Sequence, residues 1–191
     1  MPWSEEHLQW LHDTGEKIVT ACGKTAPVFE FRYDMADGDV MSLWATHFRN
    51  HYCLDDDLPV LKSPEQSNAD YLLTVKFPHG KNKPGPSIRA GDFAEILVAD
   101  YLEFLRQYYV PRTRYDRKVI GNESTKGSDV IAFKQEGDEP RNNDELLIFE
   151  VKAKLSGKAK TSVLQTAIND SSKDELRLAE TLNGIKQRLY D

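Results

Sequence analysis

The sequence predicts an α/β (α+β) fold in which helices flank a small sheet. From residue 92 onward the hydrophobic pattern runs from helix to three short strands and back to helix. Residues 1–86 instead alternate between helical and strand spacing, typical of a separate α+β region. The turn-rich stretch PHGKNKPGP, Pro78–Pro86, lies between the two patterns. We therefore expect an N-terminal region over residues 1–86 and a core domain over residues 87–191.

Four elements are predicted in the N-terminal region. Ser4 begins a short amphipathic helix over HLQWLHD, and the alternation of VFEFRY predicts a strand at Val28–Tyr33. Asp39 is a good N-cap for a helix whose apolar and aromatic residues recur at helical spacing. The run YLLTVKF predicts a second strand at Tyr71–Phe77.

The core domain begins with the clearest helix signal. Asp92 follows Gly91 and precedes a helix that we expect to run to about Tyr109, before Pro111. Three strands are expected after it, near Arg114–Ile120, Asp129–Phe133 and Leu146–Ala153. Two helices close the chain, the second of which starts at a capping box, Ser172 to Glu175.

Composition narrows the class of protein. A chain of 191 residues with 39% hydrophobic and 29% charged side chains is typical of a globular domain. No apolar run approaches the roughly 20 residues of a membrane helix, and the acidic N-terminus does not resemble a signal peptide. Two cysteines, Cys22 and Cys53, are too few for a disulfide framework, so we expect a cytoplasmic protein without a membrane partner.

Charge is unevenly distributed. Residues 1–60 hold 11 acidic and 4 basic side chains, whereas residues 61–191 hold 20 acidic and 21 basic ones. The acidic third is a poor surface for DNA and a reasonable one for a protein partner. Basic clusters occur later, at RTRYDRK and KAKLSGKAK, where they are either solvated surface or contacts for phosphates.

The stretch LLIFEVKAKL carries the strongest chemical signal. Strand alternation places Glu150 and Lys152 on one face, at the end of an apolar run. If this strand pairs with SDVIAF so that Phe133 lies opposite Leu146, then Asp129 lies opposite Glu150. Two facing carboxylates repel each other, and a divalent cation between them removes that penalty.

These residue types suit the hydrolysis of a phosphodiester. Carboxylate oxygens are ligands for Mg²⁺ or Mn²⁺, and Lys152 can stabilise charge that develops on a phosphate oxygen. The alternative is an ordinary surface ion pair between Glu150 and Lys152, which contributes about 0–1 kcal/mol.

The order of helix, Asp-bearing strand, E-x-K strand and helix resembles the PD-(D/E)xK nuclease superfamily. Residues Arg89–Asp191 more specifically resemble the HamA family, the nuclease subunit of the Hachiman anti-phage system. The matching stretches are RAGDFAEILVADYL, PRTRYDRK, KGSDVIAF, LLIFEVKAKL and NDSSKDELRLAETLN. The resemblance implies a restriction-endonuclease-like mixed sheet, metal-dependent cleavage of DNA and a helicase-type partner. It also implies that Asp129 and Glu150 bind metal and that Lys152 is the catalytic lysine.

Two further residues follow from the resemblance. Glu95 would be an acid that the first core helix adds to the metal site, although Asp92 and Glu95 also resemble a capping box. Gln165 would be a supporting glutamine in the helix after the lysine strand, and an ordinary exposed glutamine is its slightly favoured alternative.

Five basic residues are candidates for phosphate contacts: Arg112, Arg114, Lys118, Lys154 and Lys158. His47 and His51, with Cys53 nearby, have the spacing of zinc ligands, but they share a helical stripe with aromatic residues, so packed histidines are favoured. No P-loop pattern occurs, so a partner would have to supply any ATP hydrolysis. The competing function is a catalytically inactive nuclease-fold module that binds DNA or regulates a helicase.

Overall fold

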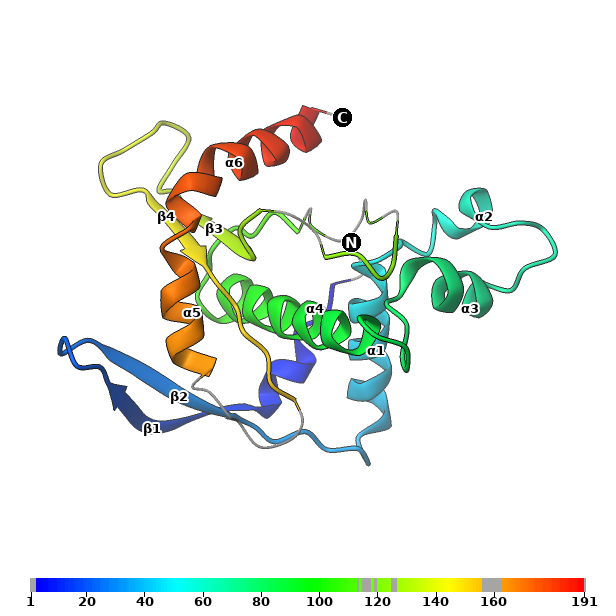
Figure 1. Ribbon diagram of the computed structural model, residues 1–191, viewed down its shortest axis with the longest axis horizontal. Helices are drawn as coiled ribbons and strands as arrows, with labels where there is room; N and C mark the ends of the chain where they lie inside the picture. Colours follow the sequence, from blue (N-terminus) through cyan, green and yellow to red (C-terminus); the bar gives the residue numbers. More distant parts are fainter. Residues whose placement is uncertain are drawn as a thin grey trace. The chain divides into compact units, whose positions relative to one another are not determined.

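The computed structural model describes residues 3–112, 114, 118, 120–124, 127–155 and 163–190, without the side chains of residues 174–176 and 188–190. The chain forms two compact units, Met1–Arg49 and Asn50–Asp191. Figure 1 labels the helices and strands along the chain. The turn-rich stretch Pro78–Pro86 lies inside the second unit, so the compact units do not divide where the change of sequence pattern placed the boundary.

The first unit is a hairpin with helical segments at both ends. A 3₁₀ turn, η1 (Glu6–Trp10), leads into β1 (Leu11–Val19), which pairs antiparallel with β2 (Thr25–Phe31) before α1 (Gly38–Asn50). The rings of Trp10, Phe31 and Trp44 form its aromatic core, with centroids 5.3 Å apart for Phe31 and Trp44 and 5.9 Å apart for Trp10 and Trp44.

Three of the four N-terminal predictions hold in outline. β2 overlaps the expected strand, α1 is the expected helix, and η1 covers part of the expected first helix. α1 begins two residues earlier than predicted, and Asp37 rather than Asp39 accepts the capping bond, from Val40 N at 3.1 Å. β1 was not predicted, because its side chains are almost all exposed and carry no apolar alternation.

The predicted strand at Tyr71–Phe77 is wrong. Its residues continue α3 (Asn68–Tyr71) as a π-helical turn, η2 (Leu72–Lys76). Ser67 caps α3 by accepting a hydrogen bond from Asp70 N at 3.1 Å. The helix start at Ser67 thus outweighs the strand propensity of the apolar run that follows it.

The second unit contains most of the helices. In chain order they are α2 (Leu58–Leu61), α3, η2, α4 (Gly85–Asp100), the π-helical turn η3 (Tyr101–Leu105), α5 (Val163–Ser171) and α6 (Asp174–Tyr190). The two closing helices are therefore confirmed.

α4 begins seven residues before the predicted start at Asp92. Pro86 lies in its first turn, where a missing N–H is tolerated. Gly85 permits a close approach, because a Cβ there would lie 2.1 Å from the His79 carbonyl oxygen. Asp92 and Glu95 therefore lie inside the helix, and the alternative interpretation of these two residues as a capping box is wrong.

The sheet of the second unit is an antiparallel hairpin of β3 (Val130–Lys134) and β4 (Glu145–Phe149). Phe133 lies opposite Leu146, so the predicted register is confirmed. A single bridge from Tyr109 to Phe133 adds a short third segment. The strand predicted at Arg114–Ile120 falls largely on residues outside the described part of the chain.

One face of this hairpin covers the core of the second unit. Val130 and Ala132 of β3 pack with Ala99 of α4 and Leu102 of η3, and Leu147 and Phe149 of β4 lie against them. The overall class is α+β, as predicted. Within the described residues the strands form two separate antiparallel pairs, rather than the single mixed sheet that was expected.

Candidate active site

Asp129 and Glu150 lie where the β3–β4 hairpin ends. The last pair of the ladder is Val130 with Phe149, so the register carries these two acids to the next opposed positions. Asp129 Oδ2 accepts a hydrogen bond from Val151 N at 2.8 Å, which ties it to the chain just after Glu150. Burial raises the pKa of the Asp129 carboxyl, and the charge of Glu150 raises it further, although Val151 N–H and Arg114 oppose this.

Glu150 and Lys152 form an ion pair beside Asp129. Lys152 Nζ donates to Glu150 Oε1, and it also lies 3.1 Å from Asp170 Oδ2 at the end of α5. The Glu150 side chain is 6% exposed, and its Oε2 is a buried atom without a hydrogen-bond partner among the described residues. Burial opposes the charged form of Lys152, but the hydrogen bonds to Glu150 and Asp170 outweigh it and raise the pKa of the ammonium.

Glu95 reaches the same region from α4. Its Oε2 lies 2.9 Å from Arg114 Nε, and Arg114 Nη2 lies 3.1 Å from Asp129 Oδ1. A guanidinium therefore joins two of the three predicted acids. Among the residues that the structure describes, Glu95, Asp129 and Glu150 do not form a group whose oxygens all lie within 4.8 Å of one another.

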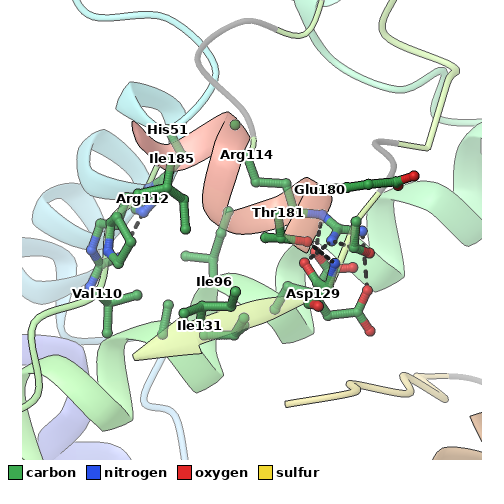
Figure 2. Close-up of a pocket in the computed structure, with 17 residues that line it drawn as sticks. His51, Ile96, Val110, Arg112, Arg114, Asp129, Ile131, Glu180, Thr181 and Ile185 are labelled. Atoms are coloured by element: carbon green, nitrogen blue, oxygen red, sulfur yellow. Dashed lines mark hydrogen bonds and ion pairs between the residues drawn. The ribbon is translucent and has the colours of Figure 1, made fainter. Parts of the chain in front are cut away.

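A pocket of about 330 Å³ opens beside this arginine. Its walls come from α4, the residues around the start of β3, and α6, with Ile96, Ile131 and Ile185 along the middle (Figure 2). Arg114, Asp129 and Glu180 lie together at one end, and His51 and Arg112 lie at the other. The acidic site thus borders an amphipathic cavity.

Arg112 is buried at the far end of the pocket. Its side chain is 6% exposed, with Nη1 2.6 Å from Asp100 Oδ1 and 2.7 Å from His51 Nε2, and Nε 2.6 Å from Glu103 Oε2. This placement differs from the exposed phosphate contact that the sequence suggested.

Lys118 is similarly enclosed. Its Nζ lies 3.0 Å from Asp92 Oδ2, which also accepts a hydrogen bond from the Tyr52 hydroxyl at 2.6 Å. Burial raises the pKa of Tyr52, and the charge of Asp92 adds to this. As placed, Lys118 is part of a buried triad and not of an exposed basic surface.

The remaining predicted residues are either exposed or lie outside the described part of the chain. Lys154 is exposed, and Lys158 lies outside the described residues. Gln165 is exposed on α5, where its Nε2 donates to Asn169 Oδ1 at 2.9 Å. Its prediction as a supporting residue stays untested.

Three contributions to the site were missed in the sequence. Arg114 was assigned to phosphates, whereas here it binds two acids; Asp170 and Glu180 were not assigned at all. Neither acid has a local signal, because α5 and α6 bring them to the site through tertiary packing.

The residues present fit a divalent cation. Carboxylate oxygens are the donors that Mg²⁺ and Mn²⁺ prefer. Glu150 Oε2, an oxygen buried without a hydrogen-bond partner in the described part of the chain, is the kind of atom that a cation satisfies. Asp129, Glu150 and Glu95 are therefore the residues that would hold one.

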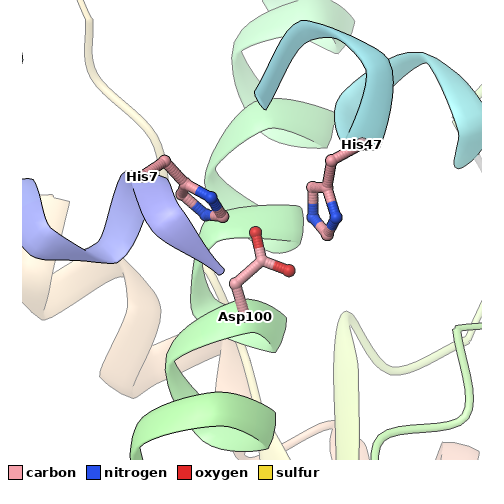
Figure 3. A group of neighbouring side chains, drawn as sticks. All are labelled: His7, His47 and Asp100. Atoms are coloured by element: carbon pink, nitrogen blue, oxygen red, sulfur yellow. The ribbon is translucent and has the colours of Figure 1, made fainter. Parts of the chain in front are cut away.

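His47 of α1 and His51, just after that helix, are both buried. His47 is fully buried in the first unit, where its ring centroid lies 5.3 Å from that of His7, and Ser4 N donates to its Nδ1 at 3.1 Å (Figure 3). In the second unit, His51 Nε2 faces Arg112, a cation that does not suit a zinc ligand. Both histidines are therefore buried among other side chains.

Comparison with known proteins identifies a family. A family model described as HamA matches residues 5–191, nearly the whole chain, and so extends the resemblance seen at Arg89–Asp191 into the first unit. No curated protein and no solved structure matches the chain. No described helix combines the length and apolar character that crossing a membrane requires.

Proposed function

The chain belongs to the HamA family, and on that premise we propose that it is a metal-dependent nuclease that hydrolyses DNA phosphodiesters. Membership of the family makes it a component of a Hachiman anti-phage defence system. The proposal adds the chemistry and a helicase-type partner, with action in the cytoplasm. The succession of α4, β3, β4 and α5 is consistent with a restriction-endonuclease-like core, which forms part of the same proposal.

The proposal rests on the charged side chains that meet around Asp129. The hairpin register brings Glu150 opposite it, Arg114 links it to Glu95, and Lys152 binds Glu150. An ordinary surface ion pair would not explain a Glu150 side chain that is 6% exposed with one buried oxygen unsatisfied in the described structure.

Each residue then has a role. Glu95, Asp129 and Glu150 would hold a Mg²⁺ or Mn²⁺ ion, which when bound supplies Lewis-acid polarisation of a phosphoryl oxygen. Lys152 stays protonated, since its pKa is raised, and can donate hydrogen bonds to a phosphate oxygen as negative charge develops on it. Glu150 and Asp170 orient that ammonium from two sides.

A cleavage assay tests the proposal. The chain, with its helicase-type partner, is incubated with plasmid DNA and Mg²⁺ or Mn²⁺, with EDTA as the blank. Lys152→Ala should lower the rate by about 10²-fold or more, because a charge-stabilising donor is lost. The matched control is Lys81→Ala, which removes an exposed lysine of the turn-rich stretch Pro78–Pro86 and should keep most of the activity.

Calorimetry separates the enzyme from an inactive module. Mn²⁺ should bind the wild type, and Glu150→Ala should abolish the binding. Absence of Mn²⁺ binding and of cleavage by the wild-type complex, with DNA binding intact, would favour the non-catalytic module instead.

We propose a surface for the protein partner from the distribution of charge. Asp55, Asp56 and Asp57 are exposed in an acidic third of the chain that suits protein contacts better than DNA. Asp56→Lys should weaken co-purification of the helicase-type partner, increasingly so at low salt. Asp138→Lys, an equal charge reversal on the loop between β3 and β4, is the control and should leave the complex intact.

A further inference from the structure

Arg114 occupies the centre of the acidic site. Its guanidinium lies 2.9 Å from Glu95 Oε2 and 3.1 Å from Asp129 Oδ1, and Nη1 donates to the Ser128 carbonyl at 2.5 Å. All three charged side chains are largely buried: 15% of Arg114, 10% of Glu95 and 13% of Asp129 is exposed. Solvent therefore does little to screen the interaction.

In the two ion pairs described for Arg114, one positive charge is shared between two negative ones. One guanidinium carries a single positive charge and faces two carboxylates, whereas a divalent cation would neutralise both. The guanidinium and a cation cannot both lie between the same carboxylate oxygens. Binding of metal by Glu95 and Asp129 thus requires Arg114 to leave at least one of them.

We propose that Arg114 is a built-in counter-ion that holds Glu95 and Asp129 together in the metal-free protein and that Mg²⁺ or Mn²⁺ displaces on binding. The inference rests on the proposed function and assigns to Arg114 a role as a positioning residue. Metal affinity is then set by a competition between an internal cation and an external one.

The far side of Arg114 is anchored to α6. Ser128 N donates to Thr181 Oγ1 at 3.2 Å, which holds the carbonyl that binds the guanidinium. Gly127 has a φ of +105°, and a Cβ there would lie 3.1 Å from Thr181 Oγ1, so this turn is pressed against the helix. Arg114 can therefore keep its carbonyl contact while its bonds to the two acids are exchanged.

The wild-type protein provides a direct test. The Nε–H resonance of Arg114 is followed by ¹⁵N NMR during a titration with diamagnetic Mg²⁺. We expect this signal to move as Mg²⁺ saturates the site, because Nε loses Glu95 as its neighbour. Arg112 lines the same pocket with its Nε on Glu103, so its resonance is the internal control and should stay in place.

Variants test the competition. Calorimetry of Arg114→Ala should show Mn²⁺ binding tighter than wild type by about tenfold, the effect that one neighbouring charge has on proton binding by a carboxylate. Arg114→Lys keeps a positive charge that cannot bridge both acids, so its Mn²⁺ affinity should lie between those of the wild type and Arg114→Ala. Lys154→Ala removes an exposed lysine two residues after Lys152, and it shows how much the loss of any positive charge changes Mn²⁺ affinity.

The outcomes separate this inference from the proposed function. If Glu150→Ala abolishes Mn²⁺ binding but Arg114→Ala leaves the affinity unchanged or weaker in a protein with a native thermal transition, only the role of Arg114 is overturned. A wild type that binds no divalent cation overturns both. Should Arg114→Ala fail to fold, the NMR titration and Arg114→Lys decide the question.

Discussion

Arg112→Ala is the substitution that most sharply separates the sequence interpretation from the structure. The sequence suggests a solvent-facing phosphate contact, whereas the structure places Arg112 between Asp100, Glu103 and His51. A surface arginine would be nearly neutral for stability and important for DNA. A buried one should be the reverse.

The expected loss of stability can be estimated by comparing two arginine–carboxylate pairs that have the same distance but differ in burial. Arg112 Nη1 lies 2.6 Å from Asp100 Oδ1, with exposed fractions of 6% and 0%. Arg32 Nη2 also lies 2.6 Å from a carboxylate oxygen, that of Glu30, but the side chains are 63% and 53% exposed. Removing one partner of a buried pair destabilises by about 3–5 kcal/mol, whereas an exposed pair contributes about 0–1 kcal/mol.

Urea unfolding of Arg112→Ala and Arg32→Ala measures this contrast. The first should lose about 3–5 kcal/mol of a total near 5–15 kcal/mol, equivalent to a fall in Tm of roughly 6–20 °C. The second should stay within about 1 kcal/mol of wild type. The burial argument would be refuted if the two variants were equally stable and Arg112→Ala bound DNA more weakly and with a smaller salt dependence. Arg112 would then be a phosphate contact, as the sequence suggested.

Three other outcomes are expected. Lys154→Glu should weaken DNA binding and lower the slope of log affinity against log salt by about one or more, as measured by fluorescence anisotropy; an unchanged slope would remove Lys154 from the DNA surface. Asp129→Asn should be more stable than wild type at neutral pH, because a carboxyl whose pKa is raised in the folded state stabilises the protein only when protonated, and that stability is lost as pH rises through the folded pKa. This difference in stability should disappear at acidic pH below the ordinary pKa range of a carboxyl. If urea unfolding shows that the two proteins do not become equally stable there, the pKa of Asp129 is not raised. Asp170→Asn should reduce cleavage by about tenfold or more while Mn²⁺ affinity stays unchanged, because Lys152 loses one of its two orienting carboxylates; Lys173→Ala, which also touches Asp170, is the control.

The position of Glu150 relative to Asp129 could be predicted because it is a local property. Strand alternation places apolar residues on fixed faces, and one hairpin register satisfies both strands, so the acids at their ends follow. The start of α4 was missed for the opposite reason. Its first turn contains Gly85 and Pro86, which are weak helix signals, and the close approach to the His79 carbonyl that requires glycine at position 85 is visible only in the structure.

The basic residues show where sequence reasoning ends. Arg112, Arg114 and Lys118 share one short segment and look equivalent, yet each meets a different buried carboxylate of α4. The sign of a charge is a property of the residue, but its burial depends on contacts that long-range packing supplies. A cluster of positive charge is therefore weak support for a DNA surface until its partners are known.

By itself, the amino-acid sequence determined the α+β class, the pairing of two strands and the family, because hydrophobic periodicity and motif spacing act over a few residues. Tertiary structure alone decided that a guanidinium lies between Glu95 and Asp129, and that Asp170 binds Lys152. The physical reason is that the energy of a charge depends on its burial and on its nearest opposite charge, and both are set by segments far away in the chain.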